Sequence, residues 1–136
     1  MVFLWSRFRG ANNLNVQLSF PLPVPPVENN LNGPIPSEIA ALENLDILIL
    51  EKNRLTGTLP DTLNAGLNRL RLNLNSLSGT VPSTLSGRLI SLDLTGNTFT
   101  GTLDDLVESL TRIKQLELGD NLFQAPSLPA WRIFHR

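Results

Sequence analysis

The segment LDILILEKNRLTGTLP (residues 45–60) contains a pattern that most of the chain repeats. Leucines at positions 48 and 50 precede an asparagine at position 53, and a glycine and a proline follow at positions 57 and 60. Aligned on the asparagine, the pattern recurs at intervals of 24, 22, 22 and 24 residues. A near-constant interval of this length is typical of a protein built from stacked units. The five aligned asparagines are Asn29, Asn53, Asn75, Asn97 and Asn121.

Apolar residues stand at fixed offsets of −8, −5 and −3 from four of these asparagines. The last two of each set are two residues apart, so their side chains point to the same face of a short strand. One strand cannot bury its leucines alone, but units stacked side by side form a parallel sheet over a continuous core. The spacing therefore predicts an α/β solenoid with four to five repeats of 22–24 residues. The sets are Leu45, Leu48, Leu50; Leu67, Leu70, Leu72; Leu89, Leu92, Leu94; and Ile113, Leu116, Leu118.

Each aligned asparagine marks the point where the chain leaves the strand. Its amide can donate and accept hydrogen bonds, so it can satisfy backbone groups of its own and of neighbouring units. We therefore predict a structural role for all five asparagines. A proline and then Ser37, Asp61 or Ser83 follow in three units, which favours a short α- or 3₁₀-helix on the side away from the sheet. Between asparagine and proline, a sharp bend is expected at Gly33, Gly57, Gly79 and Gly101.

The unit L-x-x-L-x-L-x-x-N-x-L-x-G-x-I/L/V-P resembles the plant-type class of leucine-rich repeat, which also has similar sequences in diatoms and other algae. The resemblance covers roughly residues 27–125. It implies a right-handed superhelix with a concave parallel sheet and a short second strand near the glycine. Departures from the class are Asp104 in place of proline, Ala125 in place of glycine, and the absence of the paired cysteines that usually cap such domains.

The resemblance also implies a function. Members of the class include receptor-like kinases, receptor-like proteins and polygalacturonase inhibitors, and most bind proteins, peptides or glycans on the concave face or its edge. The expected function is therefore a non-catalytic module that recognises a protein or peptide, with a glycan as an alternative ligand, within a receptor-like or secreted protein. Two other interpretations stay open: an ectodomain fragment of a receptor-like kinase whose kinase domain lies outside this chain, or a truncated gene product with no autonomous function.

Three segments differ in pattern. Residues 1–26 lie outside the repeat and are expected to be irregular, with one possible capping strand over residues 14–20, where polar and apolar residues alternate. Four prolines within residues 21–26 predict an extended linker. Residues 27–125 form the repeat domain, and residues 126–136 form an irregular tail.

Composition excludes several classes of chemistry. The net charge of −1 and the pI of 5.7 argue against a nucleic-acid binder, which needs a basic face. The chain has no cysteine and one histidine, His135, so thiolate and multi-histidine metal sites are excluded. Neither GxGxxG nor GxxxxGK[ST] occurs, and His135 follows the last repeat without any motif that would make it a catalytic base. We therefore expect no catalytic residue, no cofactor and no metal.

The sequence does not fix the location of the protein. A membrane-spanning helix needs about 20 predominantly apolar residues, and no such stretch occurs, so direct membrane insertion by this chain is not expected. The N-terminus also lacks the positive start and long apolar stretch of a secretory signal. The family resemblance implies an extracellular or membrane-tethered position in the full-length protein.

Residues between the strand leucines should face solvent on the concave sheet and form columns across neighbouring strands. Apolar and basic side chains together are favourable anchors for a peptide that carries a carboxylate. Alternatively, Arg71 pairs with Asp93 on the adjacent strand as an exposed cross-strand contact, worth at most about 1 kcal/mol. The candidate ligand-binding residues are Ile47, Ile49, Arg69, Arg71, Asp93 and Glu117.

Overall fold

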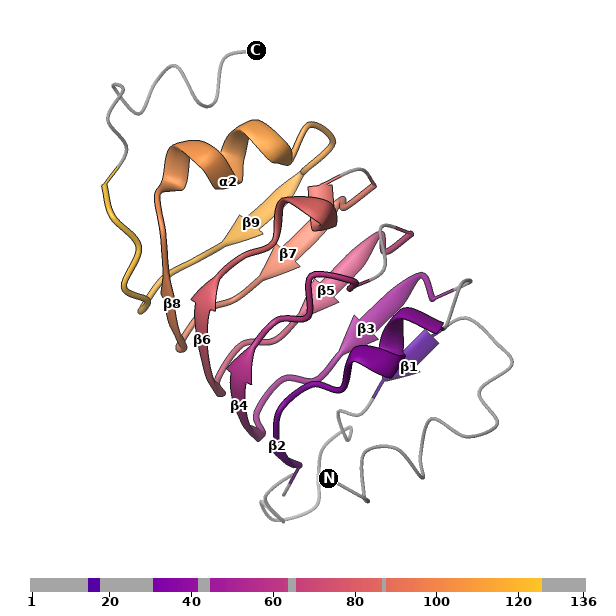
Figure 1. Cartoon of the computed structure of the whole chain (residues 1–136). Coiled ribbons are helices and arrows are strands. Elements are labelled where there is room, and N and C mark those ends of the chain that lie inside the picture. The colour runs from indigo at the N-terminus through magenta and orange to yellow at the C-terminus, as the bar shows by residue number, and fades with distance from the viewer. Residues whose placement is uncertain (1–14, 18–30, 42–44, 64–65, 87, 126–136) are drawn as a thin grey trace, which may run out of the picture.

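Two parallel β-sheets run side by side along the stacked units of the computed structural model (Figure 1). The structure describes residues 15–17, 31–41, 45–63, 66–86 and 88–125. The first sheet has the strand order β1-β3-β5-β7-β9, and the second has the order β2-β4-β6-β8. The predicted α/β solenoid is therefore confirmed. The first sheet contains β1 (Asn15–Gln17), β3 (Ile47–Ile49), β5 (Arg69–Arg71), β7 (Ser91–Asp93) and β9 (Gln115–Glu117), and the second contains β2 (Asn32–Gly33), β4 (Arg54–Thr58), β6 (Ser76–Thr80) and β8 (Thr98–Thr100).

Helical segments cover the side of the stack away from the first sheet (Figure 1). Two 3₁₀-helices, η1 (Ser37–Ala41) and η2 (Ser83–Ser86), begin directly after a proline, as the serines at these positions predicted. The fourth unit lacks this proline and forms the α-helix α2 (Leu103–Ser109), which lies against η2. The equivalent segment after Pro60 is only a turn.

The core consists of the leucines at the predicted offsets. Leu48, Leu70 and Leu92, from three successive strands, are fully buried. Phe99 and Phe123 occupy the same position in the fourth and fifth units, and their rings stack with centroids 6.4 Å apart. Burial decreases in the last unit, where β9 pairs with β7 alone among the strands that the structure describes. Its apolar residues Ile113, Leu116 and Leu118 are therefore only partly buried.

The turns after β3, β5, β7 and β9 have a left-handed residue directly before the asparagine. Lys52, Leu74 and Asp120 have φ between 52° and 57°, and Gly96 has φ 69° at the same position. A second left-handed residue is the glycine of the bend, as in Gly57 and Gly79, both with φ 79°. The bend at the repeat glycines is thus confirmed, whereas the first left-handed position was not predicted.

The N-terminal strand β1 lies within the segment 14–20 for which alternating residues predicted a strand. It pairs in parallel with β3, with Val16 beside Leu48, and so extends the first sheet at its N-terminal end. The proline-rich segment 21–26, Asn29 and the tail 126–136 lie outside the described residues. Within the described ranges, no helix is long and apolar enough to cross a membrane.

Candidate ligand-binding face

The outward side of the first sheet, which we call the first-sheet face, is formed by the residues between the buried leucines. The parallel register aligns these residues in the two columns that the repeat spacing predicted. Strand β1 adds one residue to each column, an extension that the spacing did not reveal because β1 lies outside the repeat. In strand order, the columns are Asn15, Ile47, Arg69, Ser91, Gln115 and Gln17, Ile49, Arg71, Asp93, Glu117.

Ile49 is not the solvent-facing anchor that the sequence predicted. Its side chain is buried, with an exposed fraction of 8%, whereas Ile47 is half-buried. Ile49 lies on a strand that is paired on both sides, with β1 and with β5, each about 4.8 Å away, and Arg71 of β5 is its neighbour in the column. Its apolar surface is therefore largely withdrawn from a ligand, and Ile47 is the better exposed of the two isoleucines.

Ser91 is also buried rather than exposed, at 5%. Its hydroxyl donates a hydrogen bond to Oε1 of Gln115, 3.4 Å away on the adjacent strand. The amide of Gln115 in turn donates to Oε1 of Glu117 at 2.8 Å. These contacts join the C-terminal third of the face into one polar network.

The expected cross-strand pair between Arg71 and Asp93 is wrong. No ion pair joins the two residues, both of which the structure describes, although they lie side by side in register. The Asp93 carboxylate instead accepts a hydrogen bond from the backbone N–H of Thr95 at 3.1 Å. This bond joins two residues at the end of β7 and directs the Asp93 carboxylate toward the backbone of Thr95.

Two buried polar atoms on the first-sheet face have no hydrogen-bond partner: Nε of Arg71 and Oδ1 of Asn73. The two residues are separated by one fully buried leucine, Leu72, so their side chains point to the same face. An unpaired buried donor or acceptor costs about 1–3 kcal/mol. Both residues are half-buried, so a ligand that draws their side chains outward and offers an acceptor to Arg71 and a donor to Asn73 would remove this cost.

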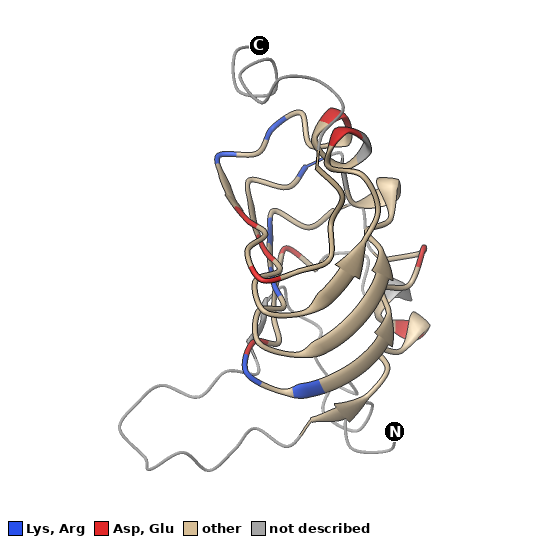
Figure 2. Ribbon diagram, turned by 90° about the vertical axis from the view of Figure 1, so that its left-hand side faces the viewer, with Lys and Arg blue, Asp and Glu red and all other residues tan. Residues whose placement is uncertain are grey.

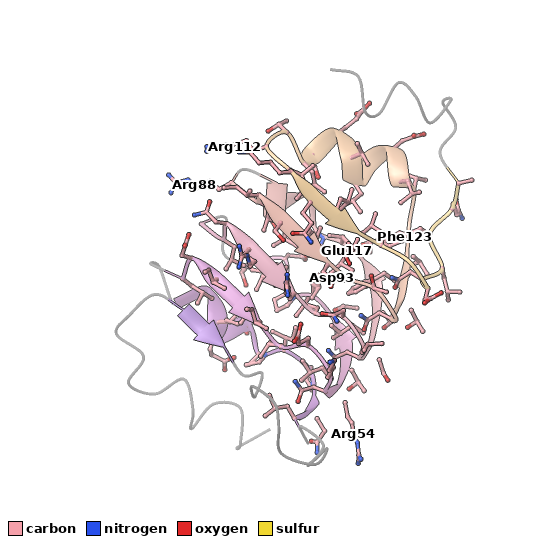
Figure 3. All side chains as sticks on the ribbon, turned by 180° about the vertical axis from the view of Figure 1, so that it is seen from behind. Arg54, Arg88, Asp93, Arg112, Glu117 and Phe123 are labelled. Atoms are coloured by element: carbon pink, nitrogen blue, oxygen red, sulfur yellow. The ribbon has the colours of Figure 1, made fainter. Side chains whose placement is uncertain are left out.

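Charge on the first-sheet face changes sign along the stack. Arg69 is exposed and Arg71 is half-buried on β5, whereas Glu117 is exposed on β9. Figure 3, which views this face directly, shows Asp93 and Glu117 beside each other on the outward side of the sheet. In Figure 2 the strands of the second sheet carry little charge, and most charged segments lie along the borders of that sheet.

The four aligned asparagines that the structure describes make their hydrogen bonds to backbone groups inside the fold. Asn97 is buried; its amide donates to the carbonyls of Leu72 and Leu94, both at 3.0 Å, and its Oδ1 accepts from the N–H of Leu77 at 3.0 Å. Asn75 and Asn121 repeat this three-way arrangement. Asn53 accepts from the N–H of Leu31 and donates to carbonyls of its own unit.

Within the described ranges, no group of three His, Cys, Asp or Glu side chains is arranged to hold a metal ion. The polar groups that converge on the first-sheet face are hydrogen-bonding and charged groups from three neighbouring strands.

A family model described as Leucine Rich Repeat matches residues 44–65 and 88–110. These segments contain two of the units whose stacking is described above. The chain is a leucine-rich repeat protein. No curated protein matches it.

Solved structures similar to this leucine-rich repeat protein are plant receptors. The ectodomain of the membrane receptor kinase GASSHO1/SCHENGEN3 from Arabidopsis thaliana, in complex with CASPARIAN STRIP INTEGRITY FACTOR 2, has 38% identity and a TM-score of 0.62, covering 69% of this chain and 12% of that chain. The Arabidopsis receptor kinase HAESA ectodomain, in complex with an IDA peptide hormone, has 34% identity and a TM-score of 0.63, covering 70% and 17%. The plant peptide hormone receptor RGFR1, in complex with RGF2, has 29% identity and a TM-score of 0.65, covering 82% and 17%.

These similarities place the repeats in the plant type. The chain spans less than a fifth of the length of each of the three receptors.

Proposed function

We propose that this chain is a non-catalytic recognition module that binds an extended peptide, or an extended segment of a protein, on its first-sheet face. The observation that carries the proposal is the pair of unpartnered buried atoms, Nε of Arg71 and Oδ1 of Asn73. Native proteins rarely leave such atoms unpaired, so each of them calls for a physical explanation, and a polar ligand is the one that we propose. A peptide chain offers both complementary groups, because its carbonyls and carboxylates accept and its N–H groups donate.

The basic strand β5 is the centre of the proposed site. Arg69 and Arg71 are on the same face, one buried leucine apart, and neither is neutralised by Asp93. Guanidinium groups bind carboxylates through paired hydrogen bonds, so a terminal or side-chain carboxylate is the expected partner of this strand. Ile47, half-buried beside Arg69, offers an apolar contact for a neighbouring ligand side chain.

Similarity to plant receptors supports a peptide ligand and a receptor context. The HAESA ectodomain and RGFR1 were solved with peptide or hormone ligands, and GASSHO1/SCHENGEN3 is a membrane receptor kinase. We therefore propose that the module belongs to an extracellular or membrane-tethered receptor-like protein. A kinase domain in the same protein is the second interpretation that these similarities favour.

Binding of random peptides tests the proposal. Immobilised protein of residues 1–136 would be exposed to a phage-displayed library of short random peptides, and the retained sequences would be compared with those retained by the double variant R69E/R71E. The native protein is expected to enrich peptides that carry a carboxylate, and the variant is expected to lose them. R88E is the matched control, because Arg88 is exposed and precedes the buried residue Leu89 outside both columns. Equal enrichment by the native protein and R69E/R71E would refute the proposal.

A further inference from the structure

The second column of the first-sheet face contains opposite charges that do not neutralise one another. Arg71 is on β5, Glu117 is on β9, and Asp93 lies between them on β7. Because Asp93 accepts from the N–H of Thr95, its carboxylate is held by its own strand end and not by Arg71. The Glu117 carboxylate accepts one hydrogen bond, from Gln115, and is otherwise exposed. A ligand therefore meets a cation at one end of this column and an anion at the other.

The other charged residues near the column do not remove this separation. Lys114 is exposed and directly precedes β9, so it lies outside the strand and outside both columns. Glu51 lies in the next column, beside the position of Asn73, and no ion pair joins it to Arg71 among the residues that the structure describes. Asp120 lies in the turn after β9 and adds to the acidic end.

The register sets the spacing between the two charges. Arg71 pairs with Asp93, and Asp93 pairs with Glu117, so the two charged residues lie two strands apart. Neighbouring strands are about 4.8 Å apart, which places their Cα atoms roughly 10 Å apart. An extended peptide advances about 3.3 Å per residue, so about three residues of ligand span this separation.

We propose that the first-sheet face selects a peptide of mixed charge, with an acidic group over Arg71 and a basic side chain about three residues away over Glu117. The inference rests on the proposed function and adds the charge order and spacing of the ligand. The peptide crosses the strands, so each ligand residue meets a different unit of the solenoid. Complementary charge at both ends fixes the position of the ligand along the stack, because a shift by one strand separates both pairs.

Single charge reversals test the spacing and the order together. In the phage selection described above, the native protein is expected to enrich an acidic and a basic residue about three positions apart. The variant R71E should instead enrich two basic residues at this spacing, and E117R should enrich two acidic residues. These outcomes do not depend on the direction in which the peptide runs. E108R is the matched control for E117R, because Glu108 is exposed on α2 at the opposite side, and it should enrich the native pattern.

Affinity measurements on synthetic peptides complete the test. Fluorescence polarisation would compare a labelled peptide with Glu and Lys about three positions apart and an isomer of the same composition in which they are adjacent. We expect E117R to weaken binding of the first peptide about two- to fivefold, as for one exposed charge pair, and to leave binding of the isomer unchanged. Thermal melts of each variant would show whether the fold is retained.

The results separate the two proposals. One result is peptide retention that depends on Arg69 and Arg71 and yet shows no preferred spacing and no response to E117R. That result would overturn the charge-order inference and leave the proposed function standing. If the native protein retains no peptide at all, both are overturned. A change of pattern in E108R equal to that in E117R would also overturn the inference, because the effect would then follow net charge.

Discussion

Asparagine at the strand exit connects neighbouring units through backbone groups that no strand can pair. The carbonyl of Leu72 accepts from the amides of both Asn75 and Asn97, and the carbonyl of Leu94 accepts from Asn97 and Asn121. Each of these carbonyls therefore receives one bond from its own unit and one from the next. The arrangement needs a side chain that donates two bonds and accepts one, which among side chains of this length only the asparagine amide provides.

Substitution of Asn97 tests this residue-scale role. Asn97→Ala would leave the N–H of Leu77 without its partner and remove one of two bonds from each of the carbonyls of Leu72 and Leu94. We expect a loss of about 1–3 kcal/mol in the free energy of unfolding, measured by urea denaturation. Asn73→Ala is the control, because Oδ1 of Asn73 has no partner, and it should change stability by less than about 0.5 kcal/mol or increase it. Equal losses in the two variants would contradict the role assigned to Asn97.

The left-handed residue before each asparagine has no sequence signature. Lys52, Leu74, Gly96 and Asp120 share this backbone conformation but no side-chain property. The repeat fixes the position through the turn geometry, and the local residue tolerates it at a cost of roughly 1–2 kcal/mol where it is neither glycine nor aspartate. This is why sequence spacing located the bend glycines but not the left-handed position before the asparagine.

At the scale of elements, the second sheet depends on close contact between neighbouring strands. Gly57 on β4 and Gly79 on β6 have the same φ of 79°, but their surroundings differ. A Cβ atom at Gly79 would lie 2.8 Å from Cγ2 of Thr58, whereas at Gly57 its nearest neighbour would be Cβ of Pro34 at 3.5 Å. The strand approach is therefore tighter at Gly79.

This difference gives a paired prediction. Gly57→Ala should cost about 1–2 kcal/mol in unfolding free energy, because alanine disfavours the left-handed region. Gly79→Ala should cost about 1–3 kcal/mol more, because it adds overpacking against Thr58. Thr58→Ser removes Cγ2, so the double variant T58S/G79A should recover most of the additional loss in urea denaturation. If Thr58→Ser gives no recovery, the contact with Thr58 is not the cause.

The sequence predicted the first sheet better than the second. Equivalent leucines must stack to form one core, so the spacing alone aligns Leu48 with Leu70 and Leu70 with Leu92. In the second sheet, the pairing is shifted by two residues relative to the repeat. Thr56 pairs with Ser76, two positions before Ser78, which is its equivalent in the next unit. The strands of this sheet have no apolar alternation comparable to that of the first sheet, so nothing in the sequence specifies that shift.

The candidate site was predictable in its columns but not in its contacts. Ile49 is buried although it stands between the strand leucines, and its strand β3 pairs with β1, which lies outside the repeat. The Asp93 carboxylate accepts from the N–H of Thr95 although Arg71 is its neighbour in register, and the spacing does not specify this side-chain conformation. Spacing identifies which residues are neighbours, whereas packing and rotamer choice decide which of them interact.

At the scale of the whole molecule, each strand that the structure describes pairs only with strands of the units directly before and after it. The strand order of both sheets follows the order of the chain, so stability is approximately a sum of unit and interface contributions. Units in the middle gain two interfaces, whereas the last described unit gains one. Its Leu122 is 63% exposed, and Leu116 is only partly buried, unlike the fully buried Leu70 and Leu92.

Hydrogen exchange should therefore show a gradient along the stack. In the middle of the first sheet, the N–H of Leu72 donates to the backbone carbonyl of Asp93 at 2.9 Å. At the C-terminal end, the N–H of Leu122 donates to the backbone carbonyl of Phe99 at 2.8 Å. Bond length alone predicts similar protection, but opening of the last unit breaks one interface and opening of the middle breaks two. We therefore expect the N–H of Leu122 to exchange faster than that of Leu72. Its opening free energy should be lower by a few kcal/mol, which is on the order of the free energy of one interface. The N–H of Leu94, which donates to Glu117, should be intermediate. Equal protection of all three amides, measured by NMR at several urea concentrations, would show that the units open only together and would contradict the additive description.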